Sequence, residues 1–473
     1  MVFSSSIFLL YFLPVFLLVY YLLPSRFRNL FAVAASIFFY AWGAPRLILL
    51  VVASIIFDFY IVHFIHTSNG RKRKVLLAFA VIVNVGMLLY FKYANFFADN
   101  INIVLAQFGS LPISLARIAL PIGISFFTFH KLSYIIDVYR DAKLPLRRLE
   151  DYSLYILFFP QLIAGPIIRY NEIADQILDR RASETVDNRL AGFFRFSVGL
   201  AKKVMIANVL GEQADKIFAY GANDLTTSLA WMGIVAYTFQ IYFDFSGYSD
   251  MALGLGRMMG FKFPENFNNP YVSQSISEFW RRWHMTLGRW MRDYLYIPLG
   301  GSKVPAWRMY MNLWIVFLIS GFWHGAAWNF IAWGGFHGFF LVADRLFLLR
   351  VYKAIGKIPS IVITFFITMI GWVLFRSPDI YFAGIFLKKM FVLEGSLDWG
   401  TNGIKVWVIL CVAVLFSFFA ASGRIENWQV KLFGGEHRMS SVGAMFAASV
   451  LLFVISLSAI TSTGFNPFIY FRF

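Results

Sequence analysis

Residues 320–329 of the chain read SGFWHGAAWN and lie inside a long apolar run. His324 stands in this run between two tryptophans, Trp323 and Trp328, and is followed by Gly325. A charged histidine is costly in hydrocarbon, so an ionisable residue inside a membrane span is a functional hypothesis by default. The stretch therefore predicts a membrane-embedded helix and a functional histidine within it.

The composition of the whole chain places most of it in lipid. Its 473 residues are 59% hydrophobic and only 14% charged, whereas soluble domains carry about 25% charged residues. Only helices and closed barrels satisfy their backbone groups in lipid, and the long continuous apolar runs differ from the alternating segments of barrels. We therefore predict an all-α polytopic membrane protein, built as a single domain over residues 1–473.

Twelve apolar stretches come near the length of about 20 residues that a helix needs to cross a bilayer. They are residues 7–23, 29–42, 47–66, 75–91, 119–137, 192–209, 228–243, 311–330, 331–349, 360–376, 404–421 and 440–462. Four further segments are shorter or broken by glycine and proline, which predicts re-entrant or interfacial pieces. They are residues 99–115, 152–168, 245–260 and 380–393.

We attribute the formal net charge of +17 to contact with the membrane and not to nucleic-acid binding, because Lys and Arg gather in cytoplasmic loops and contact anionic lipid. The basic stretches at 25–28 and 71–74 are separated by two candidate spans, so they share one side. The positive-inside rule makes that side the cytoplasm. Residues 140–148 are also basic and are expected on the same side, with the N-terminus outside.

Residues 275–292 predict a basic, aromatic helix at the membrane interface. Ser275 followed three residues later by Glu278 is a capping-box signature, so the helix should begin near Ile276. An aromatic-rich stripe recurs at helical spacing and consists of Phe279, Trp283, Leu287, Trp290 and Tyr294. Arg281 and Arg282 on this helix suit either anionic lipid headgroups or the phosphates of an acyl donor.

Two of the seven histidines are candidates for chemistry. His324 lies roughly 20 Å along a helix that begins at Met311, near the membrane midplane, and a neutral imidazole there can act as a general base. His284 is either a second catalytic or orienting group or an ordinary interfacial histidine. We expect His130 and His337 to pack, and His63, His66 and His437 to be interfacial. Asp244 and Asp250 flank a glycine-rich segment and are expected at helix ends, with the lining of a polar funnel as the alternative.

Other chemistries find no support in the sequence. It contains no Walker-type glycine loop, no GxSxG and no HExxH motif. The lone Cys411 can form neither an internal disulfide nor a cysteine-based metal site. We therefore predict no metal and no tightly bound cofactor.

Several segments, in order along the chain, resemble the membrane-bound O-acyltransferase (MBOAT) family, and in particular its bacterial alginate O-acetyltransferase-like branch. They are residues 1–5 (MVFSS), 38–42 (FFYAW), 159–170 (FPQLIAGPIIRY), 243–252 (FDFSGYSDMA), 279–284 (FWRRWH), 320–329 and 467–473 (PFIYFRF). The resemblance implies a ring of about 11 transmembrane helices around a thin core, with two opposed funnels that meet near the histidines. It maps the family's catalytic histidine onto His324 and its second histidine onto His284.

The same resemblance implies the reaction. An acyl group, expected to be acetyl, would pass from a cytoplasmic thioester to a hydroxyl for O-acetylation of an extracytoplasmic polysaccharide. The donor would be acetyl-CoA or a phosphopantetheine carrier thioester. The protein would lie in the bacterial inner membrane, and a periplasmic or exported acetyltransferase would be its partner. D-alanyl or other transfer from a carrier protein and a non-enzymatic acyl conduit are the alternatives. Expected substrate-binding residues are Trp323, Asn329, Arg281, Arg282 and Trp283.

Overall fold

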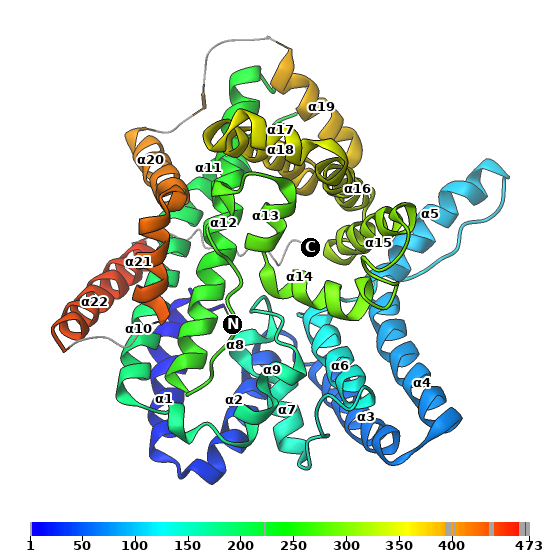
Figure 1. The fold of residues 1–473 in the computed structure, drawn as a ribbon, viewed down its shortest axis with the longest axis vertical. Helices are drawn as coiled ribbons and strands as arrows, with labels where there is room; N and C mark the ends of the chain where they lie inside the picture. Colours follow the sequence, from blue (N-terminus) through cyan, green and yellow to red (C-terminus); the bar gives the residue numbers. More distant parts are fainter. Residues whose placement is uncertain are drawn as a thin grey trace. The chain divides into compact units, whose positions relative to one another are not determined.

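The computed structural model describes residues 2–221, 224–392, 399–400, 403–434, 439–462 and 469. Over these residues every regular element is a helix and none is a strand (Figure 1), which confirms the all-α prediction. Five helical runs are long and apolar enough to cross a membrane. They are Ile48–Thr67, Gly70–Gln107, Lys357–Arg376, Ile404–Ala421 and Val442–Ser462.

The contacts of the chain divide into two compact units. Unit 1 comprises Ile7–Ser183, and unit 2 comprises Val2–Ser6 with Glu184–Phe473. The expectation of a single domain over residues 1–473 stays a prediction.

Unit 1 begins with a π-helical turn and continues as a series of helices. They are η1 (Phe8–Phe12), α1 (Leu13–Leu22), α2 (Ser25–Gly43), α3 (Ile48–Thr67), α4 (Gly70–Leu88), η2 (Leu89–Tyr93), α5 (Ala94–Gln107), α6 (Ile124–Tyr139), α7 (Leu149–Leu157), α8 (Phe159–Leu162), α9 (Tyr170–Leu178) and η3 (Arg181–Ser183). The prediction of a separate short segment at 99–115 is wrong. Helix α4 continues through η2 and α5 to Gln107, because no glycine or proline interrupts the chain between Gly86 and Gly109.

A buried charge pair joins three helices of unit 1. Asp58 of α3 pairs with Lys131 of α6 at 2.7 Å, and neither side chain is more than 1% exposed. Asn84 of α4 donates to the other carboxylate oxygen, also at 2.7 Å. Each charge would be very costly to bury alone, so this cluster specifies how α3, α4 and α6 pack.

Two basic stretches lie together at one end of unit 1. Arg73, in the first turn of α4, donates to the carbonyl of Tyr139 at 2.8 Å and pairs with Asp141 at 2.7 Å. The stretch at 71–74 therefore adjoins the start of the 140–148 stretch, as a shared cytoplasmic side requires.

Unit 2 contains the remaining elements and most of the aromatic core. They are α10 (Val186–Ala201), η4 (Lys202–Ala207), α11 (Asn208–Phe218), α12 (Thr227–Met258), η5 (Pro270–Val272), α13 (Ile276–Arg282), α14 (Met285–Met291), η6 (Arg292–Tyr296), α15 (Ala306–His324), α16 (Trp328–Ala343), η7 (Asp344–Leu348), α17 (Leu349–Ile355), α18 (Lys357–Arg376), α19 (Ile380–Phe391), α20 (Ile404–Phe418), η8 (Phe419–Ala421), α21 (Gly423–Gly434) and α22 (Met439–Ser462).

The prediction that the glycine-rich segment 245–260 is a short or broken piece is wrong. It is the second half of the 32-residue helix α12. A Cβ atom on Gly254 would lie 2.5 Å from the carbonyl oxygen of Gly192, and one on Gly247 would lie 2.7 Å from that of Gly199. These glycines therefore bring the backbones of α10 and α12 into direct contact, in antiparallel order, as small residues do between membrane helices.

Helices α15 and α16 form a second glycine-packed pair. Added Cβ atoms on Gly321 and Gly334 would overlap the carbonyl oxygens of Phe330 and Phe317, respectively. The glycine that follows α15, Gly325, is extended, and its Cα adjoins the Phe330 ring. His324 is consequently the last residue of α15, and the prediction that it lies inside a span over 311–330 is wrong.

We expect Gly334→Ala to lower the free energy of unfolding by about 1–3 kcal/mol, because its methyl group would overpack the contact with α15. The matched control is Gly335→Ala, where the added Cβ would lie 3.5 Å from Trp314 in ordinary contact and alanine favours the helix. The midpoint of thermal unfolding in one detergent measures both. Equal midpoints for the two variants would contradict close packing at Gly334.

Candidate active site

His324 lies against three aromatic rings at the end of α15. The ring centroids of Trp323, Trp333 and Phe375 are 4.8, 5.2 and 5.2 Å from that of the imidazole, and all three contacts are edge-on. The side chain of His324 is buried, with 7% of the residue exposed. The packing therefore holds the imidazole in one orientation.

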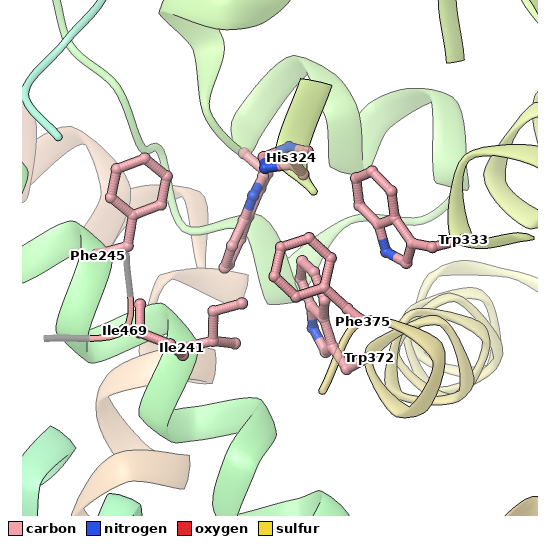
Figure 2. Close-up of a pocket in the computed structure, with 8 residues that line it drawn as sticks. Ile241, Phe245, His324, Trp333, Trp372, Phe375 and Ile469 are labelled. Atoms are coloured by element: carbon pink, nitrogen blue, oxygen red, sulfur yellow. The ribbon is translucent and has the colours of Figure 1, made fainter. Parts of the chain in front are cut away.

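The imidazole of His324 faces a narrow pocket within unit 2 (Figure 2). Its walls come from α12, the α13–α14 junction, α16 and α18, together with Ile469. They consist of Ile241, Phe245, Trp283, Trp333, Trp372, Phe375 and Ile469. These walls are apolar apart from the indole N–H groups. The arrangement suits a small apolar group held next to an imidazole.

The second histidine lies where the predicted basic helix breaks. α13 ends at Arg282 and α14 begins at Met285, while His284 adopts a left-handed backbone conformation with φ of 44°. The expectation of one continuous helix is therefore wrong, although Ser275 caps α13 as predicted, by accepting the Glu278 N–H at 3.1 Å. Left-handed non-glycine residues are strained and cluster at functional sites.

A loop that precedes α13 supports this break. The Met285 N–H donates to the carbonyl of Asn266 at 2.9 Å, and the Asn268 N–H donates to the carbonyl of Arg282, also at 2.9 Å. The backbone groups that α13 and α14 lose at the junction thus find partners in the loop, which offsets part of the strain at His284.

His284 is buried beside the pocket rather than in its wall. It is 1% exposed, and its ring meets Phe245 edge-on at 4.7 Å. The Trp323 ring connects the two histidines, because its centroid is 6.4 Å from that of His284 as well as 4.8 Å from that of His324. Burial lowers the pKa of His284 to about 3, so its imidazole is neutral at physiological pH.

Of the other residues predicted for the site, some line the pocket and others do not. Trp283 lines the pocket. Asn329 instead donates to the carbonyl oxygens of Leu374 and Ser377 at 3.3 and 2.8 Å, and so attaches α16 to the end of α18.

The two predicted arginines differ in what they contact. Arg282 pairs with Glu278 and Glu426, each at 2.9 Å, so its guanidinium joins α13 to α21. Arg281 is exposed. Arg281 is therefore the one of the two that presents its charge to solvent.

Most of the pocket wall was not predictable from the sequence. Nothing in a chain with 55 phenylalanines and 14 tryptophans indicates that the rings of Phe245, Trp333, Trp372 and Phe375 converge. Asn266, which contacts His284 from a loop 18 residues earlier, was not predicted either.

Asp244 and Asp250 lie inside α12, so the expectation of helix-end positions is wrong. Asp244 pairs with Lys203 at 2.7 Å, and the two side chains are 1% and 3% exposed. Asp244 also accepts the backbone N–H of Ile469 at 2.9 Å, which holds a pocket-lining residue in place. Asp250 pairs with both Arg195 and Lys202.

The described residues contain no group of three or more His, Cys, Asp or Glu side chains that could hold a metal ion.

Removing one partner of a buried ion pair strands the other charge, at a cost of about 3–5 kcal/mol. We therefore expect Lys203→Met to lower the free energy of unfolding by that amount. Adding Asp244→Asn should restore part of the loss, because the stranded charge is gone and the amide oxygen can still accept from Ile469. Denaturant unfolding in detergent tests both.

The neighbouring Lys202→Met is the control for that experiment. Asp250 would keep its contact with Arg195 at 2.8 Å, so a much smaller loss is expected. Losses of the same size for Lys202→Met and Lys203→Met would argue against a special role for the Asp244 pair.

Comparison with known proteins identifies the family of the chain. The family model of the membrane-bound O-acyltransferases matches residues 36–375. A probable alginate O-acetylase of Azotobacter vinelandii is 41% identical over 100% of both chains, and one of Pseudomonas aeruginosa is 47% identical over 89% of this chain and 81% of its own length. A peptidoglycan O-acetyltransferase of Helicobacter pylori is 39% identical over 84% of this chain and 80% of its own length. The chain therefore belongs to the membrane-bound O-acyltransferase family and is a multi-pass membrane acyltransferase.

Proposed function

We propose that the protein moves an acetyl group from a cytoplasmic thioester toward the hydroxyl groups of an extracytoplasmic polysaccharide, with His324 as the general base. The buried imidazole of His324 in a narrow aromatic pocket carries the proposal. Similar proteins named for the O-acetylation of alginate and of peptidoglycan support acetyl as the group and a polysaccharide as the final acceptor.

The chemistry needs one proton acceptor at the reacting hydroxyl. A neutral His324 takes the hydroxyl proton while the oxygen attacks the carbonyl carbon of the thioester. The C–S bond then breaks, and the proton passes from the imidazolium to the departing sulfur, which leaves as a thiol. The cycle returns His324 to its neutral form and consumes no net proton, so no carboxylate relay is required.

The tetrahedral intermediate carries a negative oxygen that needs a hydrogen-bond donor. Trp333 lines the pocket edge-on to His324 (Figure 2) and is 1% exposed. No acceptor among the described residues bonds its indole N–H, which can only donate. We assign the oxyanion to this donor, whereas the amide of Asn329 is already bonded to two carbonyls.

The size of the pocket favours a short acyl chain. The side chains around His324 are bulky, and Ile241 and Ile469 line the pocket together with the aromatic rings. An acetyl group places a single methyl there. The donor in this proposal is acetyl-CoA or a phosphopantetheine carrier thioester, and Arg281, which is exposed, is available for its phosphates.

The remaining parts of the proposal follow from the acceptor's location. For a polysaccharide outside the cytoplasm, the proposal includes a periplasmic or exported acetyltransferase as partner and a location of the protein in the bacterial inner membrane. A ring of about 11 helices with two opposed funnels would let donor and acceptor reach His324 from opposite faces.

We expect His324→Ala to lower acetyl transfer by about 10²–10⁴-fold, the usual contribution of general-base catalysis. Purified protein in nanodiscs would receive radiolabelled acetyl-CoA, with and without a candidate partner, and thioester consumption and label transfer would be followed. His66→Ala is the control, because it removes an exposed histidine from the last turn of α3.

Each outcome distinguishes between the alternatives. Equal consumption by wild type and His324→Ala would refute His324 as the base. Absence of consumption by the wild type, even with the partner present, would direct the search to a carrier-protein thioester or a conduit. A second assay with a D-alanyl carrier thioester then separates those two.

A further inference from the structure

We propose that Asn266 is a positioning residue that fixes the tautomer of His284, with the proton on Nδ1 and a bare lone pair on Nε2. That lone pair would accept a hydrogen bond from a hydroxyl of the acceptor. The tautomer follows from the hydrogen bonds around Asn266 alone, whereas its use by a hydroxyl rests on the proposed function.

The hydrogen bonds of the Asn266 side chain fix the orientation of its amide. The side chain is buried, with 1% of the residue exposed. One of its terminal atoms lies 2.8 Å from the Thr286 hydroxyl and 3.4 Å from the Thr286 backbone N–H. A backbone N–H can only donate, so this atom is the oxygen, Oδ1. The other atom, Nδ2, then donates to the Ser249 hydroxyl at 2.9 Å.

The tautomer of His284 follows from that orientation. Its Nδ1 lies 3.0 Å from Asn266 Oδ1, and an amide oxygen only accepts, so Nδ1 must carry a proton. A neutral imidazole has a single N–H, which leaves Nε2 without one. The hydrogen bond at one ring nitrogen thus sets the state of the other.

The bare Nε2 is a buried acceptor with no donor among the described residues. Leaving a buried acceptor unsatisfied costs about 1–3 kcal/mol, and the left-handed backbone of His284 adds to this cost. A site that carries both penalties is organised for something that binds there. A hydroxyl donor would satisfy Nε2, whereas an oxyanion would not, because this tautomer offers it no proton.

The two histidines would then have different roles toward a saccharide acceptor. Saccharides carry hydroxyls on adjacent carbons, so one hydroxyl can donate to His284 while its neighbour loses its proton to His324. Trp323 lies in contact with both imidazoles, which fits a shared acceptor. His284 would orient the acceptor, and Asn266 would act through His284.

Nitrogen-15 NMR of histidine-labelled protein in nanodiscs tests the tautomer without any substrate. The signals of His284 would be identified by their loss in His284→Gln. We expect a protonated Nδ1 and a bare Nε2 in the wild type, and a shift toward protonated Nε2 in Asn266→Leu. Protonated Nε2 in the wild type, or an unchanged spectrum in Asn266→Leu, would overturn the proposal.

Kinetics test the positioning role separately. We expect Asn266→Leu to lower kcat/KM for the acceptor by about 10–100-fold, the range seen when a metal-bound histidine loses its supporting hydrogen bond, while KM for the donor stays unchanged. Ser249→Ala and Thr286→Val are controls, because each removes another bond of the same amide and leaves the contact with His284.

The outcomes separate this inference from the proposed function. Equal losses of kcat/KM in Asn266→Leu and Ser249→Ala would show that Asn266 only stabilises the local structure, and would refute its positioning role. Wild-type protein that shows the expected tautomer but transfers no acetyl group would defeat the proposed function and leave the tautomer established.

Discussion

The structure of unit 2 depends on direct backbone contact between helices at glycines. Lipid offers no hydrophobic force to drive helices together, so close packing has to supply the energy. Between α10 and α12 the contacts occur at two points, near Gly192 and Gly199, and between α15 and α16 they centre on Gly334. The first pair brings Lys203 within reach of Asp244, and the second sets the turn that follows His324. The pocket at His324 and the ion pair between Lys203 and Asp244 both require this close contact between the helices.

Buried charges in this protein connect segments that are far apart in the chain. Asp58 joins α3 to α4 and α6 in unit 1, and Asp244 joins α12 to η4 and to Ile469 in unit 2. Because an unpaired charge is so costly inside the protein, each pair excludes packings in which its partners separate. The pocket-lining Ile469 is held to α12 by its hydrogen bond to Asp244 and by its burial in the hydrophobic core of unit 2.

Composition and periodicity predicted the all-α membrane architecture, because they depend only on average hydropathy and helical repeat. Four members of the predicted aromatic stripe, Phe279, Trp283, Leu287 and Trp290, are buried and the fifth, Tyr294, is half-buried, but the single helix expected to carry the stripe is broken at His284. The break at His284 was not predictable, because its backbone partners come from a loop around Asn266. The continuity of α12 was missed for the opposite reason: glycines that look like breaks in a sequence are contact points once a second helix fills the space beside them.

His324 is the last residue of its helix, and that position has an electrical consequence. The unbonded carbonyl groups at the C-terminus of a helix carry a partial negative charge of about half an electron, and a cation close to them gains up to about 2 kcal/mol. In the proposed reaction His324 becomes a cation for the lifetime of the intermediate. The end of α15 would then supply the counter-charge that an aspartate supplies in many enzymes with a catalytic histidine. The pocket can thus remain free of carboxylates and still accommodate a proton on its imidazole.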